Sequence, residues 1–165
     1  MEQLSTMKNL PANGDETQII TEIKQYIVIR LGDEEYGIDI NYIDNIVRMQ
    51  NITRIPHMPA FLKGVINLRG EVIPVMSLRV KMGLEEDQIG RNTRIIILKT
   101  ETEGNIGVIV DEVREVVNFS SDQIEKVAHE NVEGKQNFVN AVGKNGDELV
   151  SLLDLAMINL EDNAL

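Results

Sequence analysis

Cysteine and tryptophan are absent from the 165-residue chain, and only three tyrosines and three phenylalanines are present. Without cysteine, the protein cannot form a disulfide, use a thiolate nucleophile or bind zinc through sulfur. With so few aromatic side chains, the core has to be built from isoleucine, valine and leucine. Isoleucine and valine are β-branched and favour strands, so a mostly β fold is expected.

Basic residues are also scarce, because 16 Lys and Arg stand against 27 Asp and Glu and the formal net charge is −11. A field of that sign repels phosphate backbones and anionic lipid head groups, so we expect no nucleic-acid partner. No apolar run of about 18 residues is present, so we expect no direct membrane insertion. The first 22 residues lack the apolar core of a secretory signal, and the expected location is the cytoplasm.

Catalytic motifs are missing as well. The two histidines, His57 and His129, are not part of an HExxH pattern, and no Walker, GxGxxG or GxSxG motif occurs. We therefore expect no enzymatic activity, no metal and no cofactor. The alternative is a catalytic or small-ligand-binding β-barrel that uses Asp33, Glu35 and His57. That alternative requires the three side chains to converge in one pocket.

The stretch from Phe61 to Arg79 predicts a β-hairpin that turns at Arg69 and Gly70. Both arms are rich in valine and isoleucine, and Gly70 can adopt the positive φ that a tight reversal needs. Asn67 interrupts the apolar run before the turn, and Arg69 places a permanent charge at the tip. After the hairpin, one helical turn is expected between Ser77 and Met82.

Apolar segments on either side of this hairpin predict further strands. They cover residues 25–31, 36–40, 93–100, 106–110, 115–119, 137–142 and 148–153. Ile43, Ile46 and Val47 follow Asn41 at helical spacing, which predicts a short helix with Asn41 as its N-cap. Asp154 is expected to cap a terminal helix.

The two halves of the chain resemble each other. Four positions have an identical or similar residue 70 positions later. Gly37, Ile43, Ile46 and Val47 match Gly107, Val113, Val116 and Val117. Ser77 and Leu78 match Ser151 and Leu152 in the same way, 74 positions later. The repeat predicts two similar β-barrel subdomains, roughly 23–84 and 92–160, with possible strand exchange and flexible tails at 1–22 and 161–165. A crevice between the barrels is the natural place to receive a partner.

Three blocks of sequence carry a family resemblance. Residues 31–40 (LGDEEYGIDI), 59–70 (PAFLKGVINLRG) and 107–111 (GVIVD) closely resemble the bacterial chemotaxis coupling proteins of the CheW family. The resemblance covers about residues 22–160. It implies two SH3-like five-stranded β-barrels packed together, with a few short helices.

In functional terms the resemblance implies a non-enzymatic adaptor. Such proteins bind the cytoplasmic tips of chemoreceptors and the regulatory domain of the histidine kinase CheA, and they are recruited to receptor arrays at the membrane. Receptors thereby control kinase activity. A fused regulator, in which a coupling domain is joined to a receiver domain, is the third possibility, but the chain has no length left for a receiver domain.

The resemblance also implies site residues. Ile43, Ile46, Ile95 and Val110 match positions of an apolar groove that holds the receptor helix. Arg69, the hairpin arginine important for signalling, is implied as a further receptor-binding residue. Kinase contact is implied at Gly64 and Gly70. Two positions depart from the family pattern. Asn45 stands where a glutamate is usual, so the expected partner of Arg69 is missing unless Asp44 replaces it, and Ser77 stands where an aspartate is common.

Overall fold

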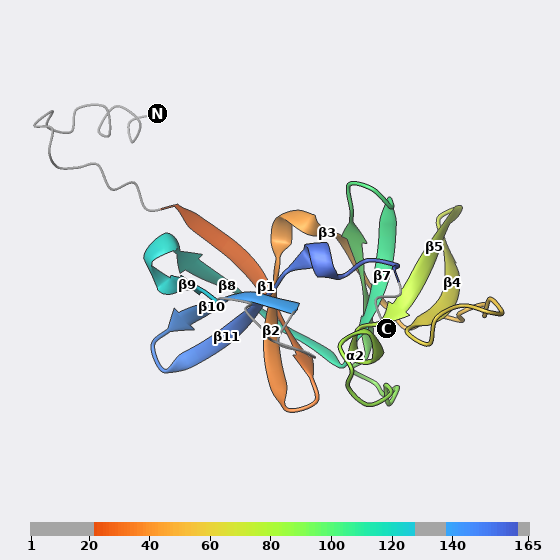
Figure 1. Cartoon of the computed structure of the whole chain (residues 1–165), viewed down its shortest axis with the longest axis horizontal. Helices are drawn as coiled ribbons and strands as arrows, with labels where there is room; N and C mark the ends of the chain where they lie inside the picture. Colours follow the sequence, from red (N-terminus) through yellow and green to blue (C-terminus); the bar gives the residue numbers. More distant parts are fainter. Residues whose placement is uncertain (1–21, 128–137, 162–165) are drawn as a thin grey trace, which may run out of the picture.

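The computed structural model describes residues 22–127 and 138–161. Within them the chain is mostly β, with two sheets and a few short helices, as the sequence predicts. Figure 1 shows the two sheets side by side, with a C-terminal segment that runs from one to the other. The predictions for His129 and for nearly all of both tails fall outside the described residues.

One sheet has six strands, so β9 extends the five strands that were expected. Their spatial order is β8 (Glu112–Ser120), β1 (Ile23–Leu31), β2 (Glu34–Asp39), β11 (Glu148–Leu153), β10 (Val139–Asn145) and β9 (Ile124–Lys126). The 3₁₀ turn η2 (Ser121–Gln123) joins β8 to β9, and η4 (Leu155–Met157) follows β11. The expected terminal helix is therefore a single 3₁₀ turn. Its cap is Asp154, which accepts a hydrogen bond from the amide of Ala156 at 3.1 Å, as predicted.

The other sheet has five strands. Their order is β3 (Ile43–Arg48), β6 (Arg94–Lys99), β7 (Asn105–Val110), β5 (Glu71–Ser77) and β4 (Leu62–Leu68). Helix α2 (Leu78–Lys81) follows β5 and confirms the helical turn predicted after the hairpin, with Ser77 accepting from the amide of Val80 at 3.1 Å. Apolar side chains of β6 are buried on both faces of this strand, which explains its continuous isoleucine run.

Each sheet takes strands from both of the expected halves, 23–84 and 92–160. The cause lies in two short connections. Only the 3₁₀ turn η1 (Ile40–Tyr42) separates β2 from β3, and only Asp111 separates β7 from β8. At both connections the chain continues into the other sheet instead of forming a hairpin, so it passes from the six-stranded sheet to the five-stranded one and later returns.

The two sheets share one plan. In each sheet a parallel strand pair stands inside an otherwise antiparallel order: β5 with β7, and β11 with β2. Val75 of β5 faces Gly107, and Leu152 of β11 faces Gly37. A Cβ atom on Gly37 or Gly107 would lie 2.8 Å from a neighbouring side chain, so both positions favour glycine.

This pairing corrects one detail of the predicted repeat. Met76 pairs with Leu62 at the start of one hairpin and Leu153 pairs with Val139 at the start of the other. The residue after Met76 therefore corresponds to Asp154 and not to Ser151. Both residues of that pair, Ser77 and Asp154, cap the helical turn that follows.

The segment predicted as a helix after Asn41 is strand β3, and that prediction was wrong. A β-bulge produces the helix-like spacing. The register of β3 against β6 shifts between Ile43 and Asn45, so Ile43 faces Leu98 and Ile46 faces Ile96. The extra residue places two isoleucines three positions apart on the same face of a strand.

The largest core cluster lies between the sheets. It takes Ile27, Ile29 and Ile38 from the six-stranded sheet and Ile96 and Val108 from the five-stranded sheet, among others. Each sheet has a second, smaller cluster on its other face. Those clusters centre on Phe119 with Val28 in one sheet and on Ile95 with Ile97 in the other.

Candidate functional site

An apolar strip follows the junction of the two sheets. Strand β3 is an edge of the five-stranded sheet and β8 is an edge of the six-stranded sheet. Ile40 of η1, Ile43 and Ile46 of β3, and Val113 of β8 are partly exposed and pack on the same central core cluster, and the exposed Val116 lies on the same face of β8 as Val113. We call the following residues the junction strip: Ile40, Ile43, Ile46, Val113 and Val116.

Strand β8 repeats the bulge of β3. Its register against β1 shifts so that Val113 faces Ile29 and Val116 faces Ile27, again three positions apart on one face. Val116 is 51% exposed. The strip therefore has two similar apolar sides, one on each sheet.

Two of the four residues expected in the groove do not reach the surface. Ile43 and Ile46 are half-buried, and they lie together in the strip. Ile95 and Val110 are both 0% exposed, Ile95 in the core of the five-stranded sheet and Val110 in the central cluster. Neither can touch a partner unless the sheet opens.

Three strip residues were missed from the sequence: Ile40, Val113 and Val116. The repeat held the signal for two of them, because Val113 and Val116 are the positions that match Ile43 and Ile46. From the second half the prediction took Ile95 and Val110 as groove residues instead of these two valines.

Arg69 and Gly70 form the exposed tip of the β4–β5 hairpin. Their φ values are 53° and 85°, so both turn residues are left-handed, as in a type I′ turn. Asn67 accepts a hydrogen bond from the amide of Gly70 at 3.2 Å, which explains an asparagine within an apolar strand. Among the described residues, no ion pair is found between Arg69 and Asp44.

Asn45, the residue after Asp44, does not replace the missing glutamate as a partner for Arg69. The side-chain oxygen of Asn45 accepts a hydrogen bond from the amide of Ile46 at 2.8 Å. This bond supports the bulge in β3 and uses the oxygen that could otherwise face a guanidinium.

Gly64 is buried in β4 under an extended loop. Thr53 of that loop exchanges two backbone hydrogen bonds with Val65, at 2.8 and 2.9 Å. Gly64 has a φ of 141°, and a Cβ there would overlap the carbonyl oxygen of Thr53 and lie 2.7 Å from the carbonyl carbon. Gly64 can therefore affect a partner surface only by setting the position of this loop.

A cavity of about 490 Å³ lies beside the loop. His57, with a φ of 63°, and the exposed Met58 and Ile89 line it. Asp33 and Glu35 lie in the β1–β2 hairpin and do not line this cavity. The three side chains of the catalytic alternative do not share it.

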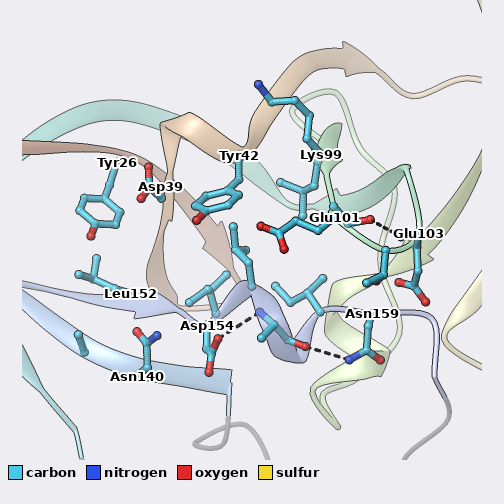
Figure 2. Close-up of a pocket in the computed structure, with 18 of the residues that line it drawn as sticks. Tyr26, Asp39, Tyr42, Lys99, Glu101, Glu103, Asn140, Leu152, Asp154 and Asn159 are labelled. Atoms are coloured by element: carbon cyan, nitrogen blue, oxygen red, sulfur yellow. Dashed lines mark hydrogen bonds between the residues drawn. The ribbon is translucent and has the colours of Figure 1, made fainter.

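A larger cavity, of about 590 Å³, lies between the sheets. In Figure 2, Tyr26 and Asp39 lie on one side of it, Glu101 and Glu103 on another, and Asp154 below. Burial and the charge of Asp39 raise the pKa of Tyr26, so its hydroxyl stays protonated. Within the described ranges, no three carboxylate or imidazole groups are close enough to hold a metal ion.

No helix in the described part of the chain is long and apolar enough to cross a membrane.

Comparison with known proteins identifies the family. The family model described as "CheW-like domain" matches residues 25–161. The chain is 33% identical to the chemotaxis protein CheW of Helicobacter pylori, over 90% of this chain and 89% of the relative. It is 32% identical to the chemotaxis protein CheW of Klebsiella aerogenes, over 86% of each.

A solved structure agrees with these sequences. The scaffolding protein TtCheW from Thermoanaerobacter tengcongensis superimposes with a TM-score of 0.74 at 33% identity, over 81% of this chain and 90% of that one. The chain described here belongs to the CheW-like domain family.

Proposed function

We propose that the protein is a chemotaxis adaptor that couples chemoreceptor tips to the histidine kinase CheA and helps to assemble both into arrays. The observation that carries this proposal is the junction strip in a chain of the CheW-like domain family. The protein would act in the cytoplasm, beside the membrane that holds the receptors. Its two subdomains would be the two sheets, with strands exchanged between the halves 23–84 and 92–160.

The junction strip is the proposed receptor site. A receptor tip is helical, and a groove of isoleucine and valine side chains accepts the apolar face of a helix. Burial of apolar surface contributes about 25 cal/mol per Å² before the costs of ordering are subtracted. Ile43 and Ile46 would contact the helix directly, whereas Val110 would support the strip from the central cluster and Ile95, on the other face of the sheet, would not take part.

The β4–β5 hairpin is the second proposed contact region. Arg69 is exposed at its tip and could select the orientation of a partner by pairing with a carboxylate. Gly70 allows the tight turn that presents Arg69, and Gly64 allows the loop through Thr53 to lie against β4. We propose kinase contact at Gly64 and Gly70, and receptor contact at Arg69.

A reconstituted kinase assay tests the proposal. Membranes that contain chemoreceptors are mixed with CheA, with and without this protein, and the rate of kinase phosphorylation is measured. The adaptor should raise the rate, and an attractant should then lower it. A rate that does not depend on the protein would reject the adaptor function.

A further inference from the structure

Asp111 connects the two sheets through one carboxylate. It is the single residue between β7, in the five-stranded sheet, and β8, in the six-stranded sheet. Arg79 of α2 donates to it from Nε at 2.9 Å and from Nη2 at 2.5 Å. The amide of Gly32, in the β1–β2 turn, donates to the same carboxylate at 2.7 Å.

The partners of this carboxylate belong to different sheets. Helix α2, which carries Arg79, continues directly from β5, whereas Gly32 joins two strands of the six-stranded sheet. The backbone adds a further link, because the amide of Asp111 donates to the carbonyl of Arg30 at 3.1 Å. We call Arg79, Asp111 and Gly32 the clasp.

Other ion pairs of the molecule differ in their placement. Arg30–Glu112, Arg114–Glu35 and Lys144–Glu125 each join strands within the six-stranded sheet. The side chains of Lys144 and Glu125 are more than half exposed, so this pair contributes little. The side chains of Arg79 and Asp111 are only 16% and 26% exposed, and a two-bond guanidinium–carboxylate pair also fixes orientation.

The clasp carboxylate is ionised near neutral pH. Burial opposes its ionisation, but the hydrogen bonds from Arg79 and from the amide of Gly32 outweigh that effect and keep the pKa of Asp111 below its ordinary value. A charged carboxylate that accepts from both sheets holds them more firmly than a neutral one could.

The position of the clasp matters because the junction strip is divided between the sheets. Ile43 and Ile46 belong to β3 of one sheet, and Val113 and Val116 belong to β8 of the other. Val113 follows Asp111 by two residues. The spacing of the two apolar sides therefore depends on how the sheets are held together at this point.

We propose that Arg79 and Asp111 are positioning residues that fix the two sheets relative to each other and so set the width of the junction strip. The proposal rests on the proposed function for its receptor readout, but its structural part needs no partner. Gly64 and Gly70 both lie in the β4–β5 hairpin of one sheet. Loss of the clasp should therefore weaken receptor binding and leave kinase binding intact.

Asp111→Asn is the main test. Asparagine keeps the shape of the side chain, but it has one acceptor oxygen for the three donated hydrogen bonds. Arg79→Lys is the second variant, which keeps the charge and loses the two-bond fork. Glu125→Gln breaks an ion pair within one sheet and serves as the matched control.

The first measurement is the distance between the sheets. Because the chain has no cysteine, pairs of introduced cysteines can carry spin labels without background. Val72 on β5 and Leu149 on β11 are 63% and 62% exposed and report across the sheets, whereas Glu115 with Leu149 reports within one sheet. Asp111→Asn should broaden the first distance distribution at least about twofold and leave the second unchanged, since only the clasp is lost.

The second measurement is binding. Asp111→Asn should weaken binding of a soluble receptor-tip fragment about tenfold, the order expected when a preorganised site is loosened. CheA affinity should stay within about twofold, and Arg79→Lys should give an intermediate loss. A sharp inter-sheet distance in Asp111→Asn overturns the proposal, and so does a broadened distance with unchanged receptor affinity.

The two measurements separate this proposal from the proposed function. If the wild-type protein binds no receptor tip, the adaptor function fails, and the label distances still decide whether the clasp fixes the sheets. If Asp111→Asn does not fold, Arg79→Lys provides the same two comparisons.

Discussion

The two sheets follow one plan but end in different hairpins. In the six-stranded sheet, β10 and β11 are joined by Gly146 and Asp147, and Gly146 has a φ of 65°. In the five-stranded sheet, the matching first turn residue is Arg69, with a φ of 53°. A left-handed conformation is easy for glycine and costs a residue with a Cβ atom about 1 kcal/mol or more. Of these two turns, only the β4–β5 turn carries this cost, because its first residue is left-handed without being glycine, which points to a use for the arginine.

A second difference concerns the bulge that opens each hairpin. The register of β4 shifts between Leu62 and Gly64, and that of β10 shifts between Val139 and Ala141. Ala141 thus occupies the position that Gly64 has in the other sheet. In both sheets a neighbouring backbone segment lies beside this position, since Thr53 pairs with Val65 in one sheet and β9 pairs with Ala141 and Val142 in the other. The carbonyl of Thr53 lies too close to Gly64 for a Cβ atom, whereas the matching position in β10 accommodates the Cβ atom of Ala141. The two sheets therefore differ in this close approach and in the charged tip of the β4–β5 hairpin.

Among the variants that test this comparison, Gly64→Ala should show the largest effect on stability. The new methyl group would overlap the carbonyl of Thr53, and the backbone at φ 141° disfavours any side chain. We expect a loss of about 3 kcal/mol in the free energy of unfolding, measured by urea denaturation.

Gly146→Ala is the control for that measurement. Its φ is also left-handed, but no atom lies within 4 Å of the new methyl group. The expected loss is only about 1 kcal/mol. Equal losses for the two variants would mean that the Thr53 loop moves away without cost.

Ile43→Asp and Val113→Asp test whether both sheets contribute to receptor binding. Each places a carboxylate in the apolar strip, where desolvation costs about 2 kcal/mol or more. We therefore expect each variant to bind a receptor-tip fragment about 30-fold more weakly, as measured by titration calorimetry. Both residues are only half-buried, so circular dichroism should show an intact fold.

A matched polar change outside the strip controls this experiment. Val72→Asp alters an exposed residue of β5. Its receptor affinity should equal that of the wild type. If Ile43→Asp weakens binding and Val113→Asp does not, the receptor contacts one sheet only.

Sequence patterns gave the fold more reliably than they gave the exposure of single residues. Strand composition, the turn at Arg69 and Gly70 and the helical turn after Ser77 follow from local chemistry, and the structure confirms them. Ile95 and Val110 were placed in a groove because they match groove positions of the family, but an apolar residue near a junction can face either a partner or the core. Only the strand register decides between these two outcomes, and the sequence does not state the register.

The helix predicted after Asn41 shows the same limit. Spacings of three and four residues normally indicate a helix. In β3 and β8 a one-residue bulge gives strands that spacing. The recurrence of the pattern at Val113 and Val116, within a chain rich in β-branched residues, was the available warning. A bulge depends on pairing with a distant strand, so local propensity cannot reveal it.

Replacement of Arg69 separates the role of its charge from the strain of its turn. Arg69→Ala and Arg69→Gly both remove the guanidinium, so both should abolish most of the kinase activation in the reconstituted assay. Glycine relieves the left-handed strain and alanine does not, so Arg69→Gly should be about 1 kcal/mol more stable than Arg69→Ala. Retained activation in either variant would remove Arg69 from the mechanism.

The smallest effect is expected for Asp87, a second carboxylate near Arg79. Both of its oxygens are buried, and neither has a hydrogen-bond partner among the described residues. Burial raises the pKa of Asp87, and the nearby Ser77 hydroxyl and Arg79 guanidinium offset this only in part. The folded protein therefore holds this proton to a higher pH than the unfolded chain does, so Asp87 lowers stability as the pH rises through that window.

The contribution of Asp111 to stability depends on pH in the opposite direction. Its pKa is lowered by folding, so its contribution is complete above the ordinary value of 3.8 and disappears as the pH falls through the folded pKa.

Asp87→Asn should stabilise the protein by about 1 kcal/mol at neutral pH, since it removes an unpaired buried charge, and by less near pH 4. Urea unfolding at both pH values measures the difference. A gain that is equal at both values would show that the lost charge of Asp87 is not its cause.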